Sequence, residues 1–321
     1  MIYLVFPTSW HPSQPYLSLP SLKAFLNKHG VHDVVQRDLA IELLNDLCTW
    51  EKTKPLYERI IRELNELSSR PRLTQVEAEK FNKLREAEEI VMALKDQIDP
   101  AVASQRSQEF YDLDQYMENL KIMDVWLDNI LAPYYPSQLT VIGSQMRFSP
   151  YSSEEVIDSF NHPEENFFYD LYEQWYLPEI LEEDIDILGI SITSVEQIIS
   201  GLTLAYLVKK NRPEIHITIG GSVFTKLVDR LENEGSHLFD FIDSFIVHEG
   251  ETPLLRLVEH LRGDGDLSKV PNLIYRQGGQ VKVNRPFAKE ELNALPTPDF
   301  DGLPLDLYLS PDRVLPVMGS R

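Results

Sequence analysis

The chain has 321 residues, which is long enough for one large domain or two ordinary ones with a substantial core. Its 51 acidic and 30 basic residues give a net charge of −21, and such a surface would repel a phosphate backbone, so we expect no nucleic-acid partner. The single cysteine, Cys48, excludes an intramolecular disulfide, and one thiol cannot ligate an iron–sulfur cluster or a structural zinc. Without a basic leader or an apolar run of membrane-spanning length, we expect a soluble protein of the reducing cytoplasm that does not bind membranes.

The first 38 residues predict a strand, a loop, a helix and a second strand. Ile2 to Phe6 is a continuous apolar run, which suits a strand that is buried on both faces. A proline-rich loop follows from Pro7 to Pro15, and apolar residues at helical spacing then predict a helix that ends at Gly30. The second strand begins at Val34.

From about residue 39 to 183 the pattern predicts helices, with almost no strand signal. Thr74 and Glu77 form a capping box, from which we expect one long amphipathic helix to continue to Ile98. A second helix is predicted by the spacing of Phe110, Leu113, Met117, Leu120 and Leu127. The aromatic residues between 167 and 176 favour helix packing over ligand contact, because aromatic side chains dominate ordinary cores.

Strands and helices then alternate with short connections. Strands are predicted at 187–193, 215–219 and 241–247, with helices after each, the last of them opened by Thr252 and Pro253. This alternation indicates βαβ units and a doubly wound parallel α/β sheet, with the large helical insertion between its second and third strands.

The segment 266–310 predicts a hairpin followed by a linker. Residues 272–276 and 280–284 would pair across Gly278 and Gly279, and the prolines that follow push the chain into an extended form. Residues 311–321 resemble the beginning of a new strand, so we expect the chain to end within a further domain.

In a doubly wound sheet the ligand lies outside the carboxyl ends of the strands, where the strand order reverses. For the order 2-1-3-4-5 this selects the loop after the first strand and the loop after the third. Their hydroxyl groups could bond the phosphate, ribose or amide groups of a large cofactor. The candidates are Thr8, Ser9, Ser191, Thr193 and Ser194.

Two glycine-containing turns lie at the same predicted edge. Gly220 and Gly221 would let a ligand approach the backbone, and Ser222 could cap a helix whose amino end favours an anion, although a tight turn would need the same glycines. The segment Glu249, Gly250 and Glu251 fits ligand contact and simple helix capping about equally.

Several common chemical motifs are missing from the sequence. No Gly-x-Gly-x-x-Gly follows a strand and no Walker loop is present, which lowers the odds of a dinucleotide or a nucleoside triphosphate. His11 could reach a metal in a cofactor, but a lone loop histidine is more often simply solvated or packed. No grouping typical of nucleophilic catalysis is identifiable, so we name no catalytic residue.

The order and spacing of five segments resemble the cobalamin-binding radical S-adenosylmethionine proteins. The segments are Phe6-Pro7 with 14–20, the strand 188–193, Ile219-Gly220-Gly221, 248–251, and the linker 295–300. The resemblance implies a flavodoxin-like (Rossmann-like) cobalamin domain, formed by 1–38 and 184–265. It also implies that Ser191 and Thr193 line the slot for the nucleotide tail, that Gly220 and Gly221 pass close to the tail or the corrin edge, and that Glu249 to Glu251 border the ring.

The sequence departs from this family in two places. The Cys-x3-Cys-x2-Cys motif that binds a [4Fe-4S] cluster is absent, so residues 311–321 would be the start of a truncated radical barrel that continues in cis. Of the Asp-x-His-x-x-Gly signature of methionine synthase-type domains, the loop has His11 but neither the Asp nor the Gly. This departure argues against His11 as the cobalt ligand, which is the role that the signature would give it.

The resemblance therefore implies a cobalamin-binding module whose parent enzyme also uses S-adenosylmethionine and a [4Fe-4S] cluster, as a methyltransferase or a peptide-modifying enzyme. This chain by itself would be inactive. The insertion 39–183 would cover part of the cofactor or the substrate entrance. Two alternatives stay open, namely a non-catalytic scaffold that docks a protein partner and a flavin- or nucleotide-binding domain on the same fold.

Overall fold

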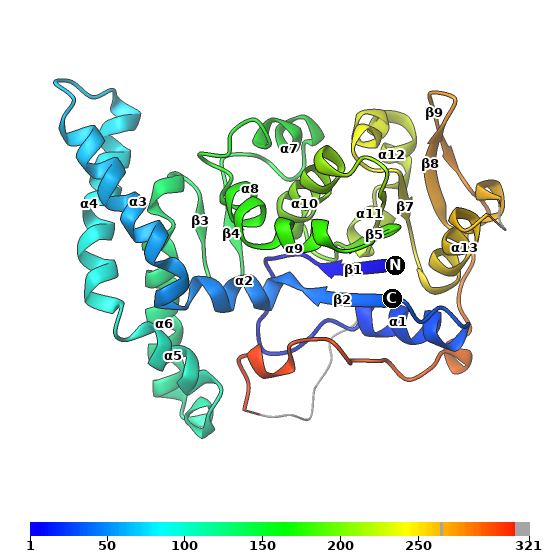
Figure 1. Cartoon of the computed structure of the whole chain (residues 1–321), viewed down its shortest axis with the longest axis horizontal. Coiled ribbons are helices and arrows are strands. Elements are labelled where there is room, and N and C mark those ends of the chain that lie inside the picture. Colours follow the sequence, from blue (N-terminus) through cyan, green and yellow to red (C-terminus); the bar gives the residue numbers. More distant parts are fainter. Residues whose placement is uncertain (264–265, 312–321) are drawn as a thin grey trace.

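The centre of the protein is a mostly parallel β-sheet flanked by helices (Figure 1). This computed structural model describes residues 1–263 and 266–311. Within them, the main sheet has seven strands in the order β2-β1-β5-β6-β7-β8-β9. The strands are β1 (Ile2–Phe6), β2 (Val34–Asp38), β5 (Ile187–Ser191), β6 (His216–Gly220), β7 (Ser244–Ile246), β8 (Leu273–Gln277) and β9 (Gln280–Val283).

The first five strands in this list are parallel, so their carboxyl ends meet at one edge of the sheet. Their order along the sheet is second, first, third, fourth, fifth, which is compatible with a Rossmann-like or flavodoxin-like fold. Leu4, Gly189 and Thr218 are register partners across β1, β5 and β6. Residues in one such row point to the same face of the sheet.

Different helices cover the two faces of the sheet. On one face, α1 (Ser18–Lys28) and α13 (Glu251–Leu261) contribute to an apolar cluster that includes Ile2 and Leu4 of β1. On the other face, α10 (Gln197–Asn211) shares an apolar core with Tyr3 and Val5. Alternate residues of β1 therefore enter different cores, which explains why its whole sequence is apolar.

The segment between β2 and β5 is largely helical. Its helices are α2 (Leu39–Leu47), α3 (Trp50–Ser68), α4 (Gln75–Leu94), α5 (Ile98–Gln105), α6 (Leu113–Ile130), α7 (Ser153–Ser159), α8 (Phe167–Leu171) and α9 (Leu177–Glu182). A short pair of strands, β3 (Gln138–Leu139) and β4 (Ser144–Gln145), lies among them. Helices α3 to α6 project from the end of the molecule opposite β8 and β9 (Figure 1).

The helical segment differs from the sequence prediction in two details. The capping box of Thr74 and Glu77 is confirmed, but the helix ends at Leu94 and a separate helix starts at Ile98. The helix predicted from Phe110 to Leu127 is confirmed as α6, but it begins at Leu113, and Leu113 and Met117 have exposed fractions of 71% and 56%. In α6 the buried apolar residues begin further along the helix, with Met123, Trp126 and Leu127.

The aromatic stretch after residue 166 packs as expected. Phe167, Phe168 and Tyr172 are fully buried in the core that the insertion shares with α10 and the sheet. The insertion and the sheet face therefore stabilise each other through one continuous apolar core.

Between β6 and β7, α11 (Ser222–Thr225) and α12 (Val228–Glu234) complete the helices, counting only the described part of the chain. The hairpin predicted around Gly278 and Gly279 forms, and β8 pairs with β7, so the hairpin extends the sheet. The following linker returns across the molecule, where the Leu309 amide donates to the Pro12 carbonyl at 2.9 Å. Residues 312–321, where we expected a new strand, lie outside the described residues.

None of the described helices combines the length and apolar composition that a membrane crossing requires.

Candidate functional site

A cavity of about 860 Å³ opens at the carboxyl edge of the sheet, on the face covered by α1 and α13. It is lined by the amino end of α1, the last residues of β5, β6 and β7, and the turn that opens α13. The cavity includes eight of the eleven predicted cofactor-binding residues. These are Ser191, Thr193, Gly220, Gly221, Ser222, Glu249, Gly250 and Glu251.

Two glycines of neighbouring strands, Gly189 and Gly220, line this face of the cavity. A Cβ atom at Gly189 would lie 2.8 Å from Leu4 Cδ2, so this strand position is already close to its neighbour without a side chain. A Cβ atom at Gly220 would meet only the Ile246 carbonyl oxygen, at the ordinary contact distance of 3.6 Å. A side chain at position 220 would therefore not collide with other protein atoms at its Cβ. It would extend into the cavity instead.

Gly221 has a different role from Gly220. Its φ is +111°, and an added Cβ atom would lie 2.0 Å from the Ile192 carbonyl oxygen. Both the backbone conformation and the close approach of the two loops require glycine at this position. The tight-turn explanation of the glycine pair thus applies fully to Gly221.

The predicted hydroxyl groups already have partners within the protein. Ser191 donates to Ser18 Oγ at 2.9 Å, and the Thr193 hydroxyl donates to Gln197 Oε1 at 3.1 Å. Ser222 donates to the Thr193 carbonyl oxygen at 3.0 Å. It is the first residue of a four-residue helix, so it joins two loops and does not act as the predicted helix cap. Of these groups, Ser18 and Ser191 form a pair that a ligand could meet at the cavity wall.

Gln197, which the sequence analysis did not single out, organises the loop after β5. The side chain is fully buried and accepts hydrogen bonds from the amides of Thr193 and Ser194, at 2.9 and 3.2 Å. Its amide group donates to the Pro7 carbonyl oxygen at 2.9 Å. This one side chain therefore fixes the loop after β5 against the loop after β1.

The other three cofactor-binding candidates and His11 do not line the cavity. Thr8 is hydrogen-bonded to the Tyr172 hydroxyl at 3.0 Å, and Ser9 donates to Ser144 at 3.2 Å, so the loop after β1 leans on the insertion. Ser194 is bonded to Glu196. His11 Nδ1 forms a hydrogen bond of 2.9 Å with the Ser13 hydroxyl in an exposed turn.

The turn before α13 forms the outer border of the cavity. Gly250 is the N-terminal flanking residue of α13, and Glu251 lies in its first turn, where a negative charge is favourable. Glu249 accepts a hydrogen bond from the Glu290 amide, and Lys289 beside it also lines the cavity. This border therefore carries both signs of charge.

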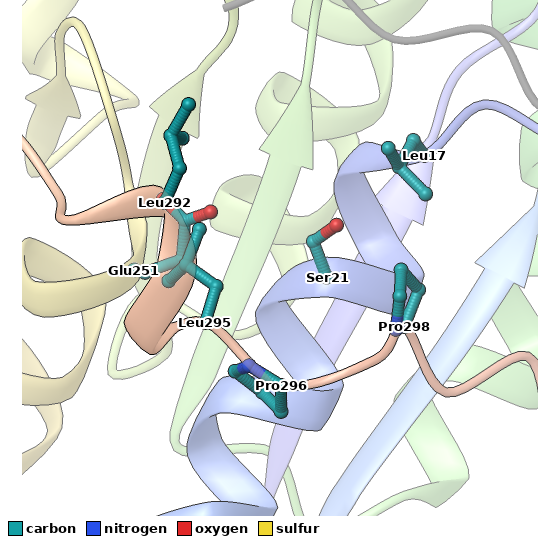
Figure 2. A pocket seen from close by; sticks show the side chains of 7 residues that line it. All are labelled: Leu17, Ser21, Glu251, Leu292, Leu295, Pro296 and Pro298. Carbon is teal, nitrogen blue, oxygen red and sulfur yellow. The ribbon is translucent and has the colours of Figure 1, made fainter.

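A smaller hollow of about 240 Å³ adjoins the cavity and shares Leu17, Ser21 and Glu251 with it. Figure 2 shows that its other wall is the linker, which crosses α1 at Pro296 and Pro298. The linker thus frames the amino end of α1 next to the cavity mouth.

Sequence reasoning missed several residues of the site. The amino end of α1, from Tyr16 to Leu22, forms a wall, and Thr218 lies on the inner surface. Gly189 carried a usable signal, because an isolated glycine inside an apolar strand often marks a close approach to another group. By contrast, nothing local indicates that Lys289 reaches the cavity.

The insertion contributes no lining residue to the cavity in the described part of the chain. It holds a separate group of possible metal ligands, because ligand atoms of His162, Glu164 and Glu165 lie within 4.8 Å of one another. These side chains already have partners, since Glu165 pairs with Arg147 and His162 with Glu164. The group is therefore explained by one ordinary ion pair and one histidine–carboxylate hydrogen bond.

Comparison with known proteins found no family model, no curated protein and no solved structure that matches this chain.

Proposed function

We propose that the cavity binds a cobalamin-type corrinoid, with the nucleotide tail inside the cavity and the corrin ring at its mouth. The observation that carries the proposal is the cavity itself. It lies beside β5, with an inner row of Leu4, Gly189 and Thr218, and it contains most of the residues that the family resemblance selects.

The shape and chemistry of the inner wall suit an aromatic base. Gly189 removes a side chain from the middle of the sheet, and Leu4 and Leu254 provide apolar surfaces around that position. Both leucines are buried, so they shield this part of the cavity from water. A planar heterocycle gains free energy from contact with such walls.

The charges around the cavity favour a ligand of low net charge. Glu249 and Glu251 stand at the border with Lys289, which is the one lysine or arginine in the described lining. A corrinoid tail carries a single phosphodiester, whereas a flavin mononucleotide or a nucleoside polyphosphate brings more negative charge. The absence of a phosphate-cradling glycine loop from the sequence supports the same choice.

When bound, cobalamin supplies a cobalt ion that can carry a methyl group from a donor to an acceptor. The residues of this chain would bind and orient the cofactor. Ser18 and Ser191 would hydrogen-bond the tail, and Gly220 would admit it. His11 is outside the cavity lining, so we propose no cobalt ligand from it.

We infer a parent enzyme of the radical S-adenosylmethionine class from the resemblance alone. The residues described here cannot hold its [4Fe-4S] cluster, because Cys48 is the sole thiol of the sequence and is buried in the core of the insertion. Cluster and S-adenosylmethionine chemistry would therefore be supplied by residues other than these.

Reconstitution with hydroxocobalamin tests the proposal. After gel filtration, we expect the protein fraction to keep the visible absorbance of the corrin and to unfold at a higher temperature than the untreated protein. Gly220→Leu should abolish retention of the corrin, because the leucine side chain would extend into the cavity. Gly143→Leu is the matched control, since a Cβ atom there meets nothing within 4 Å.

Each other outcome has a defined meaning. If the folded wild-type protein retains no corrin, the proposal is wrong. Retention of flavin mononucleotide in a parallel incubation would favour the flavin alternative, and retention of neither would favour the scaffold. Equal corrin retention by the Gly220→Leu and wild-type proteins would place any corrinoid site elsewhere.

A further inference from the structure

Three hydrogen-bonded side chains lead from the cavity wall into the sheet. Thr218 of β6 lines the cavity, and Ser244 of β7 is its register partner. Ser244 Oγ donates to Thr218 Oγ1 at 2.9 Å, and His216 Nε2 lies 2.9 Å from Ser244 Oγ. His216 is two residues before Thr218 in β6, so both side chains project from the same face.

The number of available protons fixes which group donates in each of these hydrogen bonds. A hydroxyl group has one proton, and Ser244 gives its proton to Thr218. Ser244 must therefore accept from His216, which requires the His216 tautomer with a proton on Nε2. Thr218 already accepts from Ser244, so its own proton is available to a further acceptor.

The described side chains supply no acceptor for the Thr218 proton. Among the described residues, the Ser244 bond is the one side-chain hydrogen bond that Thr218 makes. Thr218 is 3% exposed, and it lies two residues, or about 7 Å, below the end of β6. Its neighbours in the sheet row, Leu4 and Gly189, offer no polar side-chain atom.

The neutral form of His216 maintains this arrangement near neutral pH. Burial lowers the pKa of His216 to about 4, and the positive charge of Lys209 acts in the same direction, while Asp243 opposes it. The imidazole is therefore uncharged and can keep its proton on Nε2. A buried hydroxyl oriented in this way is ready to donate before any ligand arrives.

We propose that the Thr218 hydroxyl, oriented by Ser244 and His216, reads the base at the end of the corrinoid tail. The inference rests on the proposed corrinoid site and adds its specificity. The base must be detached from the cobalt and must then offer an unprotonated ring nitrogen to accept the proton, as a detached benzimidazole does. A phenolic base has no such nitrogen and would leave the buried hydroxyl unsatisfied, which costs free energy.

Competition between two corrinoids tests this specificity. The quantity to compare is the ratio of the dissociation constant of the cobamide with a cresol base to that of hydroxocobalamin, which has the same corrin ring. The cost of detaching the benzimidazole from cobalt is the same for every variant, so we expect this ratio to be about tenfold higher for the wild-type protein than for a variant without the Thr218 hydroxyl. Thr218→Val keeps the shape but removes the donor, so this ratio should fall about tenfold from its wild-type value. Thr203→Val is the matched control, because Thr203 is a buried threonine outside the cavity lining.

Two further variants separate the donor from a general packing effect. His216→Leu should reduce the preference without contact with the ligand, because Ser244 could then accept from Thr218 and turn its proton away. His216→Gln retains an N–H donor and should restore most of the preference. Affinity for the cresol cobamide that is retained or increased shows that each variant still folds around the cavity, because Thr218→Val also removes the hydroxyl that the cresol base would leave unsatisfied.

The possible failures are distinguishable. If Thr218→Val leaves the ratio unchanged, or lowers it no more than Thr203→Val does, the specificity inference is wrong while the corrinoid site stands. If neither corrinoid binds to the folded protein, the proposed function and this inference are both wrong.

Discussion

At the scale of single residues, neighbouring glycines have separable roles. Gly220 borders a cavity and meets no close protein atom at its Cβ position, whereas Gly221 is fixed by its backbone conformation and by Ile192. The distinction matters for the proposed site, because one position reports on the ligand and the other on folding.

Gly221→Ala should lower the free energy of unfolding by about 2 kcal/mol or more, because the new methyl group would collide with the Ile192 carbonyl and φ is positive. Urea unfolding of the purified variant measures the change. Gly143→Ala, in open space at an ordinary φ, should change it by less than about 1 kcal/mol. Equal stability of the two variants would show that the loop can rearrange.

At the scale of elements, a buried carboxylate joins the end of β2, the start of α2 and the returning linker. Asp38 accepts hydrogen bonds from the amides of Ala40 and Ile41 and from the Tyr308 hydroxyl, the last at 2.6 Å. Burial raises the pKa of Asp38 to about 6, although these hydrogen bonds oppose the shift. The folded protein therefore holds this proton more tightly than the unfolded chain does.

The sign of the pH effect follows from that shift. Below about pH 4, Asp38 is protonated in both the folded and the unfolded protein, so its burial adds no cost of ionisation. The free energy of unfolding then falls as the pH rises from about 4 to 6, because the unfolded chain ionises more readily than the buried group. In Asp38→Asn the side-chain oxygen can still accept the hydrogen bonds from the backbone amides, and the side chain is neutral at every pH. We expect it to be more stable than wild type at pH 8, by up to about 3 kcal/mol, and the gain to shrink at pH 5.

Urea unfolding at both pH values measures the gain. Asp114→Asn is the control, because it removes a carboxylate from the exposed first turn of α6. A gain from Asp38→Asn that is the same at pH 5 and pH 8 would contradict the raised pKa.

At the scale of the whole molecule, the net charge of −21 opposes the compact state. The insertion and the sheet share one apolar core, so this repulsion acts on a continuous folded body. Raising the NaCl concentration from 20 to 500 mM should therefore increase the unfolding temperature, since salt screens the exposed charges. Differential scanning calorimetry measures the shift. A fall in the unfolding temperature would show that the attractive ion pairs outweigh the net repulsion.

The sequence by itself determined the alternating α/β pattern and the edge at which to look for a site. Continuous apolar runs mark strands buried on both faces, and the polar and glycine residues that follow Ile190 and Ile219 mark their carboxyl ends. The same local rules gave the capping box at Thr74, because a cap depends on residues within one helical turn.

Only the tertiary structure decided which of those residues share a cavity. Thr8 and Ser9 turn to the insertion through Tyr172 and Ser144, which are distant in sequence, so no local pattern could exclude them. The hydrogen bonds that connect Thr218, Ser244 and His216 depend on the pairing of β6 with β7. Strand register and helix placement bring such side chains together, because they are set by packing over the whole core and not by sequence neighbours.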